Sequence, residues 1–332
     1  MNFRNSIVIF VAIMLFSLTA TAHHSISPFD QSKFEEIEGV ITRLGWRNPH
    51  LTADVQVTAA DGSVQVWEIE GDAINTLLRR GLVKEDLAVG TEIRFGGWPS
   101  SRGRPEMMPT NVLLSDGREI LMLDLDFPLR WTTPGVAVAV TDLKGASDEF
   151  FRVWSYNQLY QRKSPFVLTA RADEATAQYD PFTDTPSLRC IPPGMPNAIL
   201  NPYPIEFLSR DDHILLKIEE WGAERIIDTT ATAIPENAPR NRLGYSIGRL
   251  NGNVLEIETG RLIDQLLDDD GIPMSADARI LETFRIDPET DILEYEVTVT
   301  DPANLRESAT WVASWKSVEG AVMRPFDCDV SE

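Results

Sequence analysis

The chain is poor in basic residues, in histidine and in cysteine. Among its 332 residues, 30 Lys and Arg stand against 51 Asp and Glu, and the formal net charge is −21. Nucleic acids and anionic lipid surfaces are bound through clustered Lys and Arg, so this composition argues against a nucleic-acid partner. A transmembrane helix needs about 20 consecutive apolar residues. No stretch of the sequence approaches that length, and we expect no transmembrane segment.

Only two cysteines are present, Cys190 and Cys328. An even pair of cysteines in an oxidising compartment most simply forms one disulfide. The alternative, a metal held by two thiolates, has no neighbouring Cys or His to complete it. The sequence therefore predicts a Cys190–Cys328 disulfide.

The first 22 residues have the pattern of an export signal. A basic residue, Arg4, precedes the apolar run Ile7 to Leu18, and Ala20-Thr21-Ala22 follows. A basic start, a short apolar core and an A-x-A site are typical of a secretory signal peptide. We predict cleavage after Ala22 and a periplasmic or secreted mature protein, consistent with the oxidising compartment that a disulfide requires.

Residues 23–125 predict a small β-barrel. Alternating apolar residues indicate strands, an Asp-Gly pair indicates a hairpin, and Asp72 and Gly81 bound a short helix. The expected elements are strands at 38–44, 51–58 and 64–69, a helix at 73–80, and strands at 91–95 and 107–114. Three strands, a helix and two strands give an OB-like barrel. Residues 23–124 hold 16 acidic and 10 basic residues, which disfavours oligonucleotide binding by this barrel.

The second half is expected to contain a larger β domain. Residues 126–204 form a mixed, proline-rich connecting region, with strands expected at 136–140 and 150–154 and a helix capped by Thr169. Short strands separated by tight turns follow in residues 205–332, and Asn251-Gly252 marks a hairpin. The whole chain is thus predicted to be mostly β, with the second domain an antiparallel barrel or sandwich. Whether that domain is hollow or filled stays open.

Two groups of motifs resemble known families. The first group resembles an uncharacterised family of small exported bacterial proteins over about residues 20–125, and its motifs are Ala22-His23-His24-Ser25, Trp46-x-Asn48-Pro49-His50, Trp67-x-x-Glu70 and Asp116-Gly117-Arg118. This resemblance implies an exported β-barrel module without an established activity. The second group resembles another uncharacterised exported β-rich family, and includes Cys190-Ile191-Pro192-Pro193-Gly194, Ser246-Ile247-Gly248-Arg249 and Thr300-Asp301-Pro302. Where that family has histidines, this chain has Thr232 (or one of its neighbours), Tyr245 and Met274, which implies that any histidine-based site is lost here.

The histidines offer one candidate metal site. After cleavage, the α-amine and imidazole of His23 could chelate one metal ion, and His50 or His24 would add a third nitrogen. Three nitrogen ligands suit Cu(II) in tetragonal geometry. In the alternative interpretation, His23 and His24 lie in solvent at a chain end, and His50 occupies a turn after Asn48-Pro49.

Three further patterns suggest sites elsewhere in the chain. Gly244-Tyr245-Ser246-Ile247-Gly248 fits the G-x-S-x-G nucleophile pattern, but no histidine follows His213, so no catalytic residue is assigned. Asp268-Asp269-Asp270 lacks the spacing of a calcium loop and is interpreted as a solvated turn. Aromatic and aliphatic residues of the larger domain could line an apolar pocket or form its core, namely Phe207, Ile218, Trp221, Phe284, Tyr295, Trp311 and Trp315.

These observations favour an exported, non-enzymatic binding or interaction protein. Its specific form would be Cu(II) capture through His23 and His50, with His24 as an auxiliary or competing ligand. The alternative is a hydrolase, another enzyme or an apolar-ligand carrier that uses a pocket in the C-terminal β domain. The small ligand or protein partner is not identified by the sequence.

Overall fold

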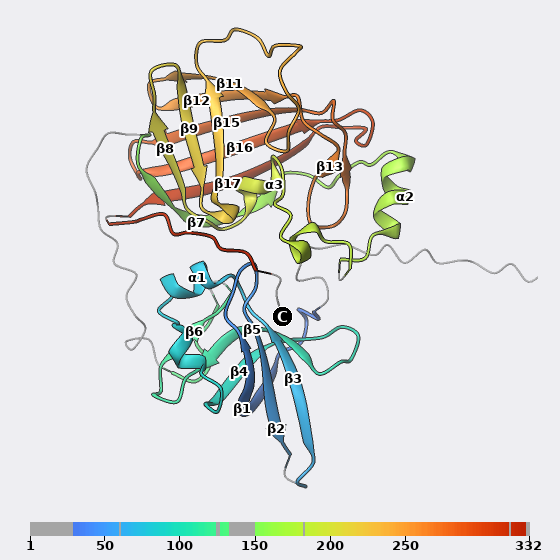
Figure 1. Cartoon of the computed structure of the whole chain (residues 1–332), viewed down its shortest axis with the longest axis vertical. Helices are drawn as coiled ribbons and strands as arrows, with labels where there is room; N and C mark the ends of the chain where they lie inside the picture. Colours follow the sequence, from blue (N-terminus) through green and yellow to red (C-terminus); the bar gives the residue numbers. More distant parts are fainter. Residues whose placement is uncertain are drawn as a thin grey trace, which may run out of the picture.

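The chain folds as two β-barrels, a small one built from the first third of the sequence and a larger one from the rest (Figure 1). The structure is a computed structural model that describes residues 29–59, 61–123, 127–132, 150–181, 183–318 and 320–329. The predicted signal peptide, His23, His24 and the strand expected at 136–140 lie outside these residues.

The small barrel has the OB-like arrangement that the sequence predicts. Its elements are β1 (Glu35–Gly45), β2 (Thr52–Thr58), β3 (Val64–Glu70), α1 (Ile74–Arg79), the 3-10 turn η1 (Lys84–Leu87), β4 (Glu92–Pro99), β5 (Glu106–Leu113) and β6 (Glu119–Leu121). The strands close in the order β1-β2-β3-β5-β4, and β3 and β5 pair in parallel while the other neighbours are antiparallel. Ile41, Val55 and Phe95 are fully buried inside it, as the alternation of apolar residues requires.

The helix α1 is capped differently from the prediction. The sequence assigned its cap to Asp72, whereas the helix starts one residue later, after Ala73, whose own side chain makes no capping bond. The side-chain oxygen of Asn48 accepts the backbone N–H of Ile74 at 3.1 Å, which satisfies one of the free donors at a helix start. Asn48 of the Asn-Pro-His motif therefore fixes this helix against the loop between β1 and β2.

The larger barrel closes with nine strands. Its elements are β7 (Val153–Arg162), α2 (Ala170–Gln178), η2 (Pro186–Arg189), α3 (Asn197–Leu200), β8 (Ile205–Ser209), β9 (His213–Ile218), η3 (Glu220–Gly222), β10 (Ala223–Asp228), β11 (Tyr245–Asn251), β12 (Val254–Gly260), β13 (Gln265–Leu266), β14 (Pro273–Met274), β15 (Arg279–Asp287), β16 (Ile292–Thr300) and β17 (Ala309–Ser317). Strand order is β10-β11-β12-β15-β16-β17-β7-β8-β9, closed into a ring. Because β7 completes the ring between β17 and β8, the domain begins before the predicted boundary at residue 205.

The interior of the larger barrel is filled by side chains. Inside it, Phe284 packs edge-to-face against Phe207, with ring centroids 5.1 Å apart, and stacks on Tyr295, with ring centroids 4.4 Å apart. A buried ion pair between Arg225 and Glu282 lies beside them. The Tyr295 hydroxyl donates to Glu282 at 2.9 Å. Phe207, Ile218, Phe284, Tyr295, Trp311 and Trp315, weighed above as a pocket lining, are core residues with exposures of 0–2%.

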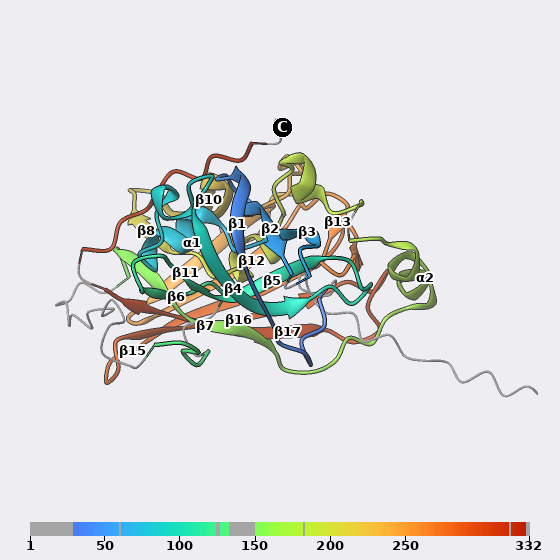
Figure 2. The ribbon, with the colours of Figure 1, turned by 90° about the horizontal axis from the view of Figure 1, so that it is seen from below.

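The C-terminal segment 320–329 connects the two barrels. In Figure 1 it runs, in red, from the larger barrel past the small one. Asn48 and Cys328 form an isolated parallel bridge, and Phe326 packs against Tyr203 and Trp221, with centroids 5.6 and 5.1 Å away. Seen from below, the small barrel lies in front of the larger one (Figure 2).

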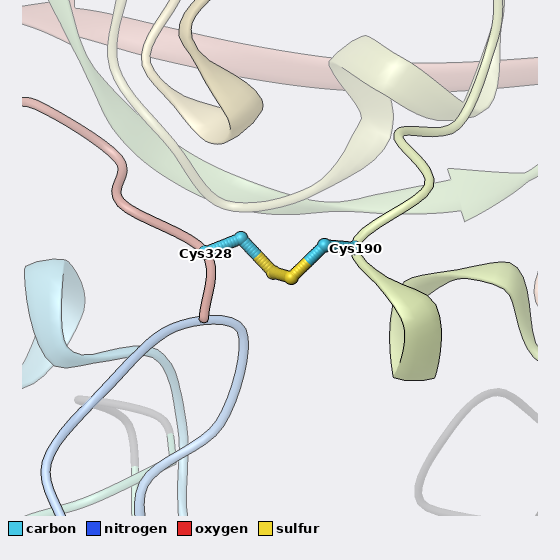
Figure 3. Close-up of a disulfide and its surroundings, with 2 residues drawn as sticks. All are labelled: Cys190 and Cys328. Carbon is cyan, nitrogen blue, oxygen red and sulfur yellow. A yellow bond between two sulfur atoms is a disulfide. The ribbon is translucent and has the colours of Figure 1, made fainter. Parts of the chain in front are cut away.

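The predicted disulfide is confirmed. Cys190 and Cys328 are bonded, with their Cα atoms 5.8 Å apart and a sequence separation of 138 positions (Figure 3). Cys190 follows η2 in the connecting region, so the bond ties the C-terminal segment to the proline-rich stretch beside the larger barrel. The same segment is thereby held at both barrels.

Candidate functional site

A cavity of about 460 Å³ lies between the two barrels and is the candidate site. This volume is in the range of small-molecule binding sites. Its wall combines apolar and aromatic side chains with a few polar ones. From the small barrel and the chain that follows it come His50, Asp72, Trp98, Leu123 and Phe127, and from the larger domain Ser187, Ile191, Asn197, Asn201, Tyr203, Glu220, Trp221, Arg242, Gln265, Asp268 and Asp269, among others.

A polar junction holds the barrels together next to this cavity. Glu219 is 1% exposed, and its carboxylate pairs with Arg79 of α1. It also accepts the side-chain N–H of Asn75 at 2.9 Å and the backbone N–H of Arg324 at 2.7 Å. Asn75 in turn is bonded to Asn48 at 3.2 Å. Both barrels and the C-terminal segment thus meet at one buried carboxylate.

Glu220 and Trp221 follow immediately and face the cavity. Trp221 has φ 60° and ψ 5°, a left-handed conformation that costs a non-glycine residue on the order of 1–3 kcal/mol. Packing against Phe326 helps to hold it there. Glu220 is 7% exposed, and the Asn201 amide N–H group lies 2.9 Å from each of its carboxylate oxygens. Burial raises the pKa of Glu220 to about 8, despite the hydrogen bonds from Asn201.

A second pair of carboxyl groups comes from the loop between β13 and β14. Asp268 is 5% exposed, and it accepts the backbone N–H groups of Asp270 and Ile272 at 3.1 and 3.3 Å. Burial, followed by repulsion from Asp270, raises the pKa of Asp268 to about 7. Asp269 accepts the side-chain N–H of Asn197 at 2.8 Å.

The small barrel contributes Asp72 and His50. Burial raises the pKa of Asp72, although Arg80 lies 3.6 Å away and opposes the shift. The His50 Nδ1 lies 3.9 Å from Glu70, and the imidazole is 30% exposed. Carboxyl groups whose pKa values are raised by burial in a cleft are frequent features of functional sites, and here they come from both sides of one cavity.

Of the three predicted metal ligands, only His50 is within the described residues, and it lines the cavity. In this part of the chain no group of three or more His, Cys, Asp and Glu side chains is placed to hold a metal ion. Because His23 and His24 fall outside it, the copper site stays a prediction.

Ser246 does not have the surroundings of a nucleophile. It is 2% exposed on β11, inside the larger barrel, and its hydroxyl accepts from the Arg225 guanidinium at 2.9 Å. His213, the last histidine of the sequence, bonds instead to Asp212. A nucleophilic serine needs an adjacent base, so this serine supports no hydrolase mechanism.

Two expectations about the cavity residues were wrong. Asp268 and Asp270, interpreted as parts of a solvated turn, are 5% and 9% exposed. Trp221, grouped with the inner residues of the larger barrel, lines the interdomain cavity instead. Glu220, Tyr203 and Asp72 were not recognised as site residues, since their roles depend on how the two barrels meet and no local pattern marks them.

A second, more open groove of about 540 Å³ lies over β7, β15, β16 and β17. Its wall includes Asn157, Arg285, Glu294 and Ser314. None of the carboxyl groups whose pKa is raised lies there. The interdomain cavity is therefore the stronger candidate.

The fold and the cavity define a two-barrel protein with a ligand-sized chamber between its barrels. Residues 12–108 match the model of a family of unknown function (DUF6152), which supports an uncharacterised domain in the region of the small barrel. The match includes His50, Asp72 and Trp98 and ends within β5. No curated protein matches the chain. None of the helices in the described ranges is long and apolar enough to cross a membrane.

Proposed function

We propose that this protein binds a small molecule, without catalysis, in the cavity between its two barrels. The observation that carries the proposal is a ligand-sized interdomain cavity whose wall mixes aromatic rings with buried carboxyl groups. Binding sites occur preferentially at domain interfaces and combine an apolar wall with a few placed polar groups. The disulfide and the Glu219 junction fix the positions of the two sides of this wall relative to each other, so the site is largely formed before a ligand binds.

Binding is tested with the neutral fluorescent probe N-phenyl-1-naphthylamine. The probe should bind with a stoichiometry of one and gain fluorescence as it leaves water. Ser187 lines the cavity and has no side-chain hydrogen bond in the described residues. Ser187→Trp should therefore fill part of the space and weaken binding by roughly tenfold or more, which corresponds to about 1.4 kcal/mol.

Ser209→Trp is the matched control, since Ser209 is exposed at the end of β8 and does not line the cavity. It should leave probe binding unchanged. Absence of saturable binding to the unmodified protein, or equal affinities for the two tryptophan variants, would contradict the proposal.

Cu(II) capture is a second candidate. The feature that favours it is the partly exposed His50 imidazole, which faces the cavity rather than the core. An EPR titration on protein cleaved after Ala22 should show one equivalent of nitrogen-coordinated copper, lost in His50→Ala. Weak binding that is unchanged in this variant would refute it.

A further inference from the structure

The carboxyl groups of the interdomain cavity outnumber the basic side chains on its wall. Four of them line it, Asp72, Glu220, Asp268 and Asp269, against one arginine, Arg242, and one histidine, His50. Asp72 lies 3.6 Å from Arg80, which is not a lining residue. Within the described ranges, neither Arg242 nor His50 forms an ion pair with any of the four. The wall therefore carries excess negative charge whenever these groups are ionised.

The other three carboxyl groups are held by neutral donors. Asn201 donates to Glu220, Asn197 donates to Asp269, and backbone N–H groups donate to Asp268. Neutral donors orient a carboxylate but add no compensating charge. A buried carboxylate without a cation is expensive to ionise, and a bound cation would remove this cost.

A second, independent feature points to a ligand. Tyr203 is 5% exposed and lines the cavity. Its carbonyl oxygen accepts the indole N–H of Trp315 at 2.9 Å, and its ring packs edge-on against Phe326. Its hydroxyl has no hydrogen-bond partner among the described residues. Buried tyrosine hydroxyls usually find a partner, so this one is available to a bound molecule.

Aromatic rings supply the rest of the wall. Trp98 and Phe127 form an edge-to-face pair with centroids 5.7 Å apart, and Trp221 lies in the same cavity. The face of an aromatic ring attracts cations, most strongly for tryptophan. The apolar area also favours a ligand with a hydrocarbon or aromatic body.

We propose that the ligand is an organic ammonium ion with an apolar body, whose charge binds near Glu220 and Asp269. This inference rests on the proposed function, because it names the class of molecule that the cavity takes. Tyr203 would hydrogen-bond to the ammonium group or to a polar substituent beside it, and Trp98, Phe127 and Trp221 would contact the apolar body.

Binding of such a cation is coupled to proton release. Glu220 is surrounded by Asp72 from the small barrel, Asp269 from the β13–β14 loop and Tyr203. The Glu219–Arg79 pair lies beside it in the chain junction. Burial leaves Glu220 protonated at neutral pH, with a pKa of about 8. A cation stabilises the ionised form, so its affinity should rise with pH while that of a neutral ligand stays constant.

The test uses two matched competitors for the fluorescent probe, 2-phenylethylamine and 2-phenylethanol. They share an apolar body and differ in charge, and a primary amine stays protonated well above neutral pH. The amine should bind at least roughly tenfold more tightly near neutral pH. This preference should increase between about pH 6 and about pH 8.5, as Asp268 and then Glu220 lose their protons.

Variants that remove a single charge show which carboxyl groups cause the preference for the amine. Glu220→Gln and Asp269→Asn should each remove most of the preference for the amine and leave the affinity for the alcohol unchanged. Glu224→Gln is the control, because Glu224 is 59% exposed on β10 and pairs with Lys217. Two independent variants keep the test decisive if one of them folds poorly.

The outcomes separate this inference from the proposed function. If the probe binds but the amine and the alcohol compete equally or not at all, the cation inference is overturned and the binding site remains. A preference that both cavity variants retain would also overturn it. If the probe itself does not bind, both proposals fail.

Discussion

Replacing Glu220 by glutamine should stabilise the protein at alkaline pH. The carboxyl group is 7% exposed, and its side-chain hydrogen-bond partners, Asn201 and Trp221, are both neutral. Glutamine has the same shape, accepts the same N–H group and never ionises. The substitution therefore removes the cost of burying a negative charge while leaving the packing in place.

The sign and size of this change in stability follow from the pKa shift of the Glu220 carboxyl group. Its pKa is 4.5 ordinarily and about 8 in the folded protein. Between these values the unfolded chain has lost the proton and the folded protein has kept it, so the free energy of unfolding falls as pH rises. Each pKa unit corresponds to about 1.4 kcal/mol, which sets a ceiling of roughly 5 kcal/mol. Relaxation and water entry reduce this, and we expect roughly 2–4 kcal/mol at about pH 8.5.

Urea unfolding followed by tryptophan fluorescence measures the difference. The Glu220→Gln variant should exceed the unmodified protein in stability at about pH 8.5 and match it within about 1 kcal/mol near pH 4.5. Glu224→Gln, on the exposed surface, should follow the unmodified protein throughout. Parallel stability curves for the unmodified protein and Glu220→Gln, or a less stable variant at high pH, would refute the reasoning.

Two other perturbations test the interface between the barrels. Glu219→Ala should lower the free energy of unfolding by about 3 kcal/mol. This is the low end for a buried ion pair, because Arg79 is 28% exposed. A difference of less than about 1 kcal/mol in urea unfolding would contradict this prediction. Replacing Cys190 and Cys328 by serine opens a loop of 138 residues and should cost roughly 2–5 kcal/mol. Thermal unfolding with and without a reductant measures it: the reductant should destabilise only the unmodified protein, and equal sensitivity of both proteins would be inconsistent with the bond.

The sequence predicts the barrels better than it predicts the site. Apolar residues such as Ile41 and Val55 alternate with polar ones along each strand, and this pattern depends only on the strand itself. The strands could therefore be recognised one by one, and their order indicated an OB-like barrel. The pairing of Cys190 with Cys328 followed from their number. The closure of the nine-strand barrel could not be predicted as well, because β7 pairs with β17 and β8, which are distant from it in the sequence.

The cavity could not be predicted because its wall is assembled from distant segments. Asp72, Tyr203 and Glu220 become neighbours only when Glu219 and the C-terminal segment join the barrels. Asp268 lies in an acidic run that is usually a solvated turn, and no local pattern marks its burial in the folded β13–β14 loop. Asn48 belongs to a recognisable motif, yet its role in holding α1 emerges from the fold.

A crystal structure of the protein soaked with 2-(4-bromophenyl)ethanol tests the central claim most directly. Because this molecule is neutral, its binding tests the cavity alone and not the preference for a cation. The anomalous signal of bromine locates the bound molecule without ambiguity. The account predicts one strong bromine peak in the cavity between Trp98 and Trp221. A cavity filled by side chains, or bromine peaks only on the outer surface of the barrels, would contradict it.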